Sequence, residues 1–435
     1  MIGHRNLAPR RVRALAAAAF SLGLAGSLAA PAHADGTIRM WTFLNPDGTS
    51  GREQALKQMI GAFEASHPGV AVQVEQQVWD QMTPKFLAAH ASGSAPDVIW
   101  VHSEMLGGVL DAGALGPIAA LAAADADLAN SLYASATVDG AQYGVGHSYT
   151  IMGIHARADW LKEAGIAPDS IKTWADLEDA AARLTVRNGD TVERWGFCQH
   201  FGMAKVDPGI LLASMLAGET PAFAPDGTAT WATPEAVAGL ERSVKLIRDG
   251  VSPPDAANWN NDDMYDQFAA GRCAMATGTA VRVPKMQEAV GAENVAFLPY
   301  PSDDPSRPSP QVMNAWIVGV WSGSEVADLA GEFVAALSSP ESDRLWVTVG
   351  GAVPVRGSTA GAVGDFFDDP ANQYLRSAME YIRSGGWVAP IGADVGGYRD
   401  DMNRAVQSVL INGTDPGAAL EEAEAAYNAR HGYAR

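Results

Sequence analysis

Polar and aromatic side chains follow segments whose apolar patterns are typical of β-strands. Trp41 and Asn45 lie at the end of the segment that begins at Thr37, and His102 and Glu104 follow a short buried segment. Carboxylates, amides and guanidinium groups form hydrogen bonds with hydroxyl groups, whereas aromatic faces pack against the apolar side of a ring. These residue types therefore fit the binding of a small, hydroxyl-rich molecule.

No local pattern marks a catalytic centre. A glycosidase needs two carboxylates about 5–10 Å apart across the scissile bond, and no stretch of the sequence identifies such a pair. The sequence also lacks G-x-S-x-G, H-E-x-x-H and a phosphate-binding P-loop. His102, His147 and His200 do not have the spacing of a metal motif. We therefore expect no enzyme activity, no cofactor and no metal, with a saccharide hydrolase as the alternative from a different class.

The first 34 residues have the pattern of a secretory signal peptide. Four arginines precede an apolar stretch over Ala14–Leu28, and an A-x-A cleavage signal ends at Ala34. We expect cleavage after Ala34 and a soluble periplasmic protein. The cleavage point has no Cys to carry a lipid, so we expect no lipid anchor. A retained N-terminal anchor is the alternative. The pair Arg10-Arg11 leaves the choice between general and twin-arginine export open.

Length and charge restrict the possible architectures and partners. Cleavage would reduce the 435 residues to 401 and change the net charge from −20 to −24, because the leader holds four arginines and no acid. A chain of this length predicts two domains, and its acidity argues against nucleic-acid and anionic-membrane partners. The two cysteines, Cys198 and Cys273, either form a disulfide in an oxidising compartment or are small buried residues.

The candidate residues lie on alternating strand and helix patterns. Strands are predicted over 37–43, 70–74 and 97–101, with helical patterns between them, which indicates a parallel sheet covered by helices. The alternation restarts after Tyr143. Thr173 opens a capping box, and two helical runs close the chain.

Several segments together resemble the family 1 extracellular solute-binding proteins of ATP-binding-cassette importers, the group that includes maltose and glycerol-3-phosphate binding proteins. They occur in the family's order over nearly the whole mature chain. The sequence departs from the family pattern at His155-Ala156, where Tyr-Asn is usual, and at Gly146, where Pro is usual. The matching segments are Ala95–Val98 with Asp111–Leu115, Tyr143–Val145 with Ile154–Gly165, Thr173–Leu177, Phe268–Met275, and Leu329–Leu337 with Gly350, Gly351 and Pro354.

The resemblance implies an α/β fold of the type II periplasmic-binding-protein kind, with two α/β lobes joined by crossing hinge strands and a ligand cleft between them. It places lobe one at residues 35–145 and 313–384, and lobe two at residues 146–312 and 385–435. The implied function is the substrate-binding component of an importer that captures a sugar, oligosaccharide or polyol. The implied partners are that small solute and the permease subunits at the inner membrane, and the chain is expected to act as a monomer. A separate chemosensory role stays open.

The resemblance and the strand ends together predict a ligand-binding set. Glu104 stands where relatives often carry a hydroxyl-binding carboxylate, while Arg399 keeps open an anionic ligand such as a sugar acid, sulfosugar or glycerophosphodiester. Structural roles are the alternatives: a core position for Trp41 or Trp316, a helix cap for Glu104, and a surface pair with Asp400 or Asp401 for Arg399. The predicted set is Trp41, Asn45, His102, Ser103, Glu104, Ser148, Tyr149, His200, Thr279, Asn314, Trp316, Tyr398 and Arg399.

Overall fold

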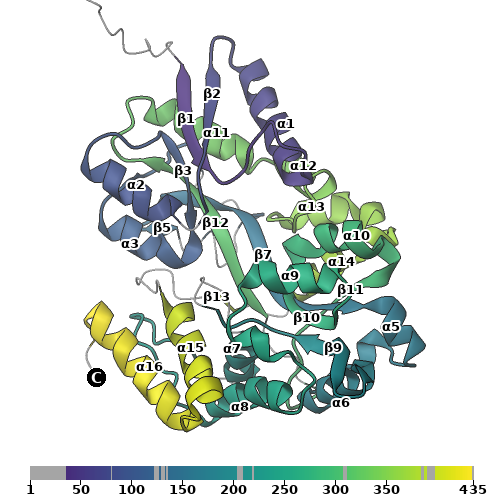
Figure 1. The fold of residues 1–435 in the computed structure, drawn as a ribbon. Coiled ribbons are helices and arrows are strands. Elements are labelled where there is room, and N and C mark those ends of the chain that lie inside the picture. The colour runs from purple at the N-terminus through teal and green to yellow at the C-terminus, as the bar shows by residue number, and fades with distance from the viewer. Residues whose placement is uncertain are drawn as a thin grey trace, which may run out of the picture. The chain divides into compact units, whose positions relative to one another are not determined.

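The fold is taken from a computed structural model of the chain (Figure 1). The predicted signal peptide, residues 1–34, lies outside the described residues. The structure describes residues 36–79, 81–121, 127–128, 133, 136–202, 209–217, 220–306, 311–383, 387–388 and 397–433.

Eleven strands form one mixed sheet, which runs in the order β2-β1-β3-β12-β7-β10-β9-β8. Strand β11 pairs with β7, and both β13 and β4 pair with β12. The strands of this sheet are β1 (Thr37–Thr42), β2 (Ala71–Gln76), β3 (Val98–His102), β4 (Leu115–Gly116), β7 (Gly144–Arg157), β8 (Val186–Asn188), β9 (Thr191–Cys198), β10 (Cys273–Thr279), β11 (Val295–Leu298), β12 (Val312–Trp321) and β13 (Trp387–Val388). A separate hairpin contains β5 (Thr137–Val138) and β6 (Ala141–Gln142).

The predicted βαβαβ beginning is confirmed. Strand β1 pairs in parallel with both β2 and β3, which places the ends of β1 and β3 at the same edge of the sheet. Strands β7 and β12 pair antiparallel with each other. On its other side β12 pairs with β3, and on its other side β7 pairs with β10, so the two strands join the two halves of the sheet. The two strands are therefore the long central connections visible in Figure 1.

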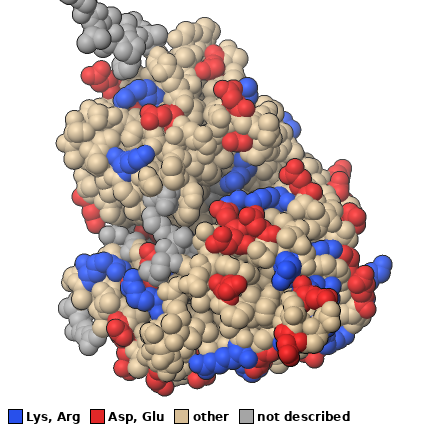
Figure 2. Space-filling view, viewed as in Figure 1, with Lys and Arg blue, Asp and Glu red and all other residues tan. Residues whose placement is uncertain are grey.

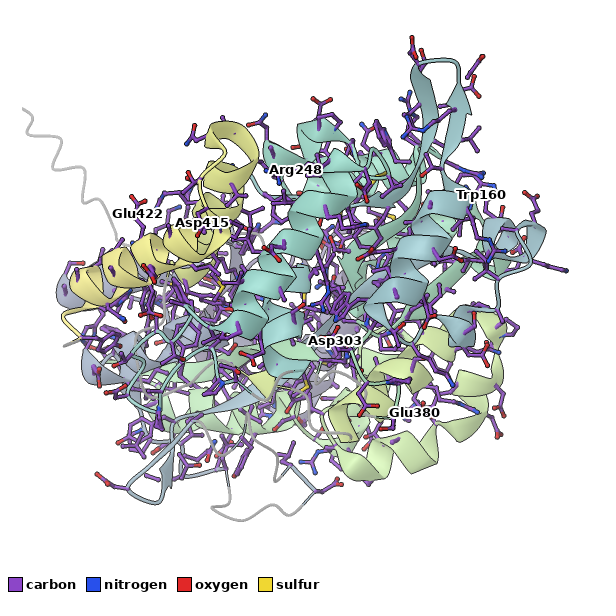
Figure 3. All side chains as sticks on the ribbon, turned by 90° about the horizontal axis from the view of Figure 1, so that it is seen from below. Trp160, Arg248, Asp303, Glu380, Asp415 and Glu422 are labelled. Carbon is purple, nitrogen blue, oxygen red and sulfur yellow. A yellow bond between two sulfur atoms is a disulfide. The ribbon has the colours of Figure 1, made fainter. Side chains whose placement is uncertain are left out.

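Helices cover the sheet and begin where the sequence supplies caps. Thr173 accepts a hydrogen bond from the Asp176 N–H in the predicted capping box of α6. Helix α16 begins after Asp415 and packs against α8, as Figure 3 shows from below. The α-helices are α1 (Gly51–Ser66), α2 (Met82–Ala91), α3 (Leu106–Asp111), α5 (Ala158–Glu163), α6 (Trp174–Leu184), α7 (Gly209–Ala217), α8 (Pro234–Arg248), α9 (Asn261–Ala269), α10 (Val283–Val290), α11 (Ala327–Leu337), α12 (Pro340–Thr348), α13 (Gly357–Ala362), α14 (Gln373–Arg383), α15 (Tyr398–Gln407) and α16 (Pro416–His431).

Two large hydrophobic cores lie along the sheet. The first core packs α1, α11 and α12 against β1, β3 and β12, and it includes the fully buried Trp100 and Trp346. The second core packs α6, α7, α8, α15 and α16 together and includes the fully buried Trp231 and Tyr427. The lobe boundaries expected from the resemblance stay a prediction.

Cys198 and Cys273 form a disulfide, which resolves the alternatives left open by the sequence. Cys198 ends β9 and Cys273 begins β10, and these neighbouring strands are parallel. Their Cα atoms are 5.8 Å apart, within the range that a disulfide spans. The bond closes a loop with a sequence separation of 75 residues.

Within the described part of the chain, no helix has both the length and the apolar character needed to cross a membrane.

Candidate functional site

A hollow of about 210 Å³ lies where loops and strand ends from both halves of the sheet converge. Figure 2 shows Lys or Arg side chains beside the recess between the upper and lower parts of the visible face. The residues that line the hollow are Phe43, Arg52, Trp79, His102, Thr150, Met152, His200, Asn261, Thr279, Val281, Arg282, Asn314, Trp316 and Arg399.

Strand pairing brings the central lining residues together. Trp316 on β12 lies opposite His102, the last residue of β3. On the other side of β12, Asn314 lies opposite Thr150 on β7. These three strands are neighbours in the sheet, so residues more than 200 positions apart in the sequence share one surface.

The end of β10 and the turn that follows it supply another part of the lining. Thr279 ends β10 and pairs with Met152 on β7. The chain then turns through a 3-10 helix, Ala280–Arg282, before α10. Tyr265 donates to the Thr279 hydroxyl at 3.3 Å or accepts from it, and the Thr279 N–H donates to the Tyr265 hydroxyl at 3.0 Å. The buried Tyr265 thus holds the turn that carries Arg282.

Aromatic residues form one wall. Trp316 packs on Phe43 with ring centroids 4.7 Å apart and meets His102 edge-on at 5.2 Å. Trp316 is 8% exposed, so it is both a packed residue and a lining residue. Trp79 is different, because 46% of its surface is exposed. An exposed indole at the edge of a hollow is free to pack on a ligand ring.

Glu104 and Arg399 form a buried pair beside the hollow. The Arg399 guanidinium donates to Glu104 Oε1, and the Tyr398 hydroxyl donates to the same oxygen at 3.2 Å. Burial raises the pKa of Glu104, while the charge of Arg399 and the hydrogen bond from Tyr398 act in the opposite direction. The surface location considered for Arg399 is wrong, because this side chain is buried and contacts Glu104. Asp401, one of the two partners considered for it, pairs with Arg404 and Arg430.

Six of the thirteen predicted residues line the hollow: His102, His200, Thr279, Asn314, Trp316 and Arg399. The other seven are not among its lining residues, and a ligand role for them stays a prediction. Glu104 and Tyr398 both form hydrogen bonds with Arg399, which does line the hollow. Ser148 lies opposite Trp316 in the register of β7 and β12.

The remaining four make contacts within the protein. Trp41 donates through Nε1 to Glu75 at 2.9 Å. Asn45 accepts from the Asp47 N–H at 3.0 Å, and Ser103 accepts from the Ala315 N–H at 3.2 Å. Tyr149 is a buried member of the first core.

Sequence reasoning missed eight lining residues. Trp79 could have been predicted, because it follows the predicted second strand just as His102 follows the third. Arg52 is the second residue of a helix, and nothing in its local pattern distinguishes it from a solvated charge. The full set is Phe43, Arg52, Trp79, Thr150, Met152, Asn261, Val281 and Arg282.

Three buried histidines predict acid sensitivity. Burial lowers the pKa of His147 to about 3 and the pKa values of His155 and His200 to about 4. Below the unfolded pKa of about 6.5, the unfolded chain therefore binds more protons than the folded chain, and stability falls as the pH falls. Each histidine is expected to remove about 1 kcal/mol between pH 6.5 and 5.5. Urea unfolding at pH 7.5, 6.5 and 5.5 measures this loss.

Replacement of His147 measures how much of this loss of stability comes from that one histidine. His147 lies between Trp100 and Trp346, with ring centroids 5.1 and 4.6 Å away. His147→Phe keeps a ring there and removes the titrating group, so the loss of stability between pH 6.5 and 5.5 should shrink by about a third, its share of three equal contributions. An unfolding midpoint that does not move between these pH values would contradict the prediction.

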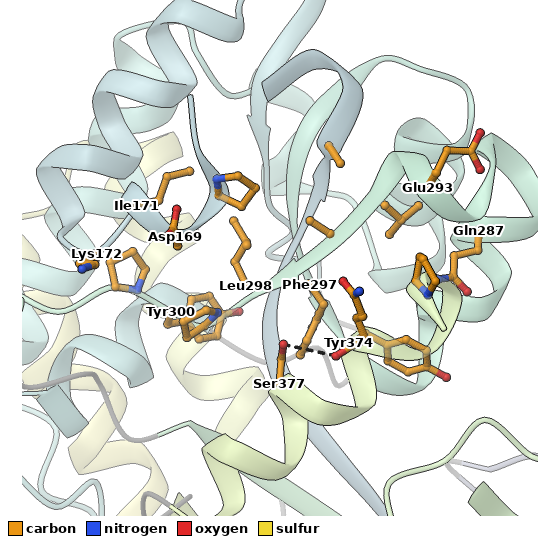
Figure 4. Close-up of a pocket in the computed structure, with 18 of the residues that line it drawn as sticks. Asp169, Ile171, Lys172, Gln287, Glu293, Phe297, Leu298, Tyr300, Tyr374 and Ser377 are labelled. Carbon is orange, nitrogen blue, oxygen red and sulfur yellow. Dashed lines mark hydrogen bonds between the residues drawn. The ribbon is translucent and has the colours of Figure 1, made fainter. Parts of the chain in front are cut away.

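A second cavity of about 690 Å³ is larger but chemically different. It lies along β11, and none of the thirteen predicted residues lines it. Figure 4 shows Phe297, Leu298 and Tyr300 among its lining residues, together with Tyr374 and Ser377 of α14. Its lining is mostly apolar and rich in proline, so the smaller hollow is the better candidate for a hydroxyl-rich ligand. Among the described residues, no group of three or more His, Cys, Asp or Glu is placed to hold a metal ion.

Comparison with known sequences adds a family and relatives. Residues 48–344 match the family model described as bacterial extracellular solute-binding protein. An uncharacterized lipoprotein from the oleD 5′ region of Streptomyces antibioticus is 31% identical over 178 residues, which cover 39% of this chain and 39% of that protein. A protein of Escherichia coli (strain K12), provisionally named ABC transporter periplasmic-binding protein YcjN, is 24% identical over 322 residues and 72% of each chain. The chain thus spans about two fifths of the first of these relatives.

Comparison with solved structures establishes the fold. The GacH receptor of Streptomyces glaucescens GLA.O, solved without ligand and with acarbose, has a TM-score of 0.77 at 20% identity and covers 92% of this chain and 99% of its own. The maltose-bound MalE3 of T. maritima has a TM-score of 0.74 at 19% identity and covers 91% and 99%. The predicted type II binding-protein fold is therefore confirmed.

Proposed function

Because this chain belongs to the bacterial extracellular solute-binding protein family, we propose that it captures a sugar, oligosaccharide or polyol and delivers it to the permease subunits of an ATP-binding-cassette importer. The solved relatives bound to acarbose and maltose support a saccharide. The fold neighbours and the family consist of binding proteins, and we propose that this chain likewise has no enzymatic activity.

The observation that carries this proposal is the composition of the hollow. Trp79 and Trp316 offer aromatic faces, and Thr150, Asn261 and Asn314 offer hydroxyl and amide groups. This combination of ring faces and neutral hydrogen-bonding groups matches the apolar faces and hydroxyls of a sugar. In the described lining there is no Asp or Glu, so the paired carboxylates of a glycosidase do not face this hollow.

The crossing strands supply a mechanism for capture. The lining residues come from segments on both sides of β7 and β12, so a bound solute contacts both proposed lobes, 35–145 with 313–384 and 146–312 with 385–435. A ligand that contacts both lobes stabilises the closed arrangement, with bending at the crossing strands. The importer would then distinguish loaded from empty protein by this closure.

The finer cellular assignment is also part of the proposal. Residues 1–34 would direct export and be removed after Ala34, leaving a soluble monomer in the periplasm. The apolar leader, the oxidised cysteine pair and the periplasmic and lipoprotein relatives support an extracytoplasmic location.

A thermal-shift screen over neutral sugars, oligosaccharides, polyols, sugar acids, sulfosugars and sugar phosphates tests the proposal. A ligand at 100 times its Kd should stabilise the protein by about 2.7 kcal/mol. Trp79→Ala should weaken that ligand's binding about tenfold without lowering the melting temperature of the free protein, because Trp79 is 46% exposed. Val186→Ala, an exposed position on β8, is the matched control and should change neither value. No stabilising compound in the whole panel, or hydrolysis of the one that stabilises, would contradict the proposal.

A further inference from the structure

The charge of the hollow is opposite to that of the chain. The whole sequence has 30 Lys and Arg residues against 50 Asp and Glu residues. The described lining of the hollow nevertheless contains Arg52, Arg282 and Arg399 and no acidic residue. A concave site lined by charges of one sign attracts ligands of the other sign.

Two of these arginines have carboxylate partners. Glu104 lies against Arg399, and both side chains are buried. The positive charge of Arg399, the residue that first suggested an anionic ligand, is therefore offset by the negative charge of Glu104. Arg282 contacts Asp262 at 3.1 Å, but the Asp262 side chain is 66% exposed, so that pair is largely solvated and weak.

Arg52 has no such partner among the residues that the structure describes. It lies in the first turn of α1 with its guanidinium 5.7 Å from the centre of the Phe43 ring. The neighbouring Glu53 accepts from the Ser50 and Asn45 N–H groups at 3.0 and 3.2 Å, so its carboxylate caps the helix. Arg52 thus brings to the hollow a positive charge that no ion pair within the described residues holds, although the nearby charge of Glu53 acts on it.

Arg52 and Arg282 both line the hollow and lie close enough to interact electrostatically. Arg52 belongs to α1 of the first core, and Arg282 follows β10 in a turn whose buried residues Ala280 and Val283 also belong to that core. Burial and the positive charge of Arg282 lower the pKa of Arg52 to about 10. The two cations therefore repel each other in a partly desolvated space, and an anion between them would relieve that repulsion.

We propose that the captured solute carries an oxyanion, such as a carboxylate, sulfonate or phosphate group, which Arg52 and Arg282 bind together in the hollow. Guanidinium forks bind such groups with two parallel hydrogen bonds, and the rest of the solute lies toward Trp79 and Trp316. This inference rests on the proposed solute-binding function and specifies the class of solute. It also gives the anion a role in closure, because Arg52 falls in proposed lobe one and Arg282 in proposed lobe two.

Matched neutral and anionic compounds test the inference by calorimetry at 20 mM NaCl. The pairs are glucose with glucuronate and glucose 6-phosphate, galactose with galacturonate, 6-deoxyglucose with its 6-sulfonate, and glycerol with glycerol 3-phosphate. At least one anionic member should bind about tenfold or more tightly than its neutral counterpart. Its affinity should fall about 10- to 100-fold in Arg52→Gln and in Arg282→Gln, and it should weaken when NaCl is raised to 500 mM.

Two further variants separate charge from general damage. Arg52→Lys keeps the charge and should retain part of the affinity. Lys57→Gln removes an exposed cation of the same helix, which pairs with Asp47, and should leave affinity unchanged. Binding by neutral members only, or an anion preference that survives both arginine replacements, would overturn the inference while leaving the solute-binding function intact. Binding by no member of any pair would count against both.

Discussion

Replacement of Glu104 by Ala is expected to lower the free energy of unfolding by about 3–5 kcal/mol, the usual cost of removing one partner from a buried ion pair. Glu104 accepts from Arg399 and from the Tyr398 hydroxyl, and both Glu104 and Arg399 are less than 10% exposed. Without the carboxylate, the Arg399 cation stays in a desolvated place where its attraction to Glu104 no longer offsets the cost of burial. Urea unfolding at pH 7.5 measures the difference.

Glu104→Gln is the matched control for this prediction. It keeps the size of the side chain and an oxygen acceptor for Tyr398 while it removes the charge, so its loss should be smaller than that of Glu104→Ala. Arg404→Ala removes a charge from the same helix as Arg399, but its side chain is 56% exposed, and its effect should be within about 1 kcal/mol. A Glu104→Ala protein as stable as its parent would contradict the prediction that the buried pair stabilises the fold.

Loss of the disulfide is the second large expected effect. The double variant Cys198→Ala with Cys273→Ala should be less stable by about 4 kcal/mol, because the bond closes a loop with a separation of 75 residues and restricts the unfolded chain. Both cysteines are fully buried between β9 and β10, so a small apolar replacement keeps the native packing nearly intact.

Reduction of the parent protein provides the comparison. Unfolding in the presence of a strong thiol reductant should bring the parent close to the stability of the double variant, while the variant itself should not respond. Equal stability of parent and variant under oxidising conditions would contradict the prediction. Solute affinity should change little, because neither cysteine lines the hollow.

Much of the fold was predictable because its signals are local. The capping box at Thr173, the Asn188-Gly189 turn and the alternation of Val70, Val72 and Val74 each identify an element without knowledge of the rest of the chain. The lengths of the strands were harder to predict from the sequence. Strand β7 extends over Gly144–Arg157 because it pairs with β12, β10 and β11, and those partners are distant in the sequence.

The site was predictable only where strand ends define it. His102, Asn314 and Trp316 line the hollow because β3 and β12 pair there, and the family resemblance had placed all three in the predicted set. Arg52 was missed because its role depends on where α1 packs. Glu104 was identified from its motif position, but its pairing with Arg399, about 300 residues later, becomes visible only in the tertiary structure.

The central claim is that the protein binds a solute and releases it unchanged. Titration calorimetry with the solute that stabilises the protein most, followed by an NMR spectrum of that solute after prolonged incubation with the protein, tests this claim directly. The expected result is one saturable site per chain and a spectrum without new resonances. Resonances of a cleaved product, or no saturable binding by any saccharide, polyol, sugar acid, sulfosugar or sugar phosphate, would contradict it.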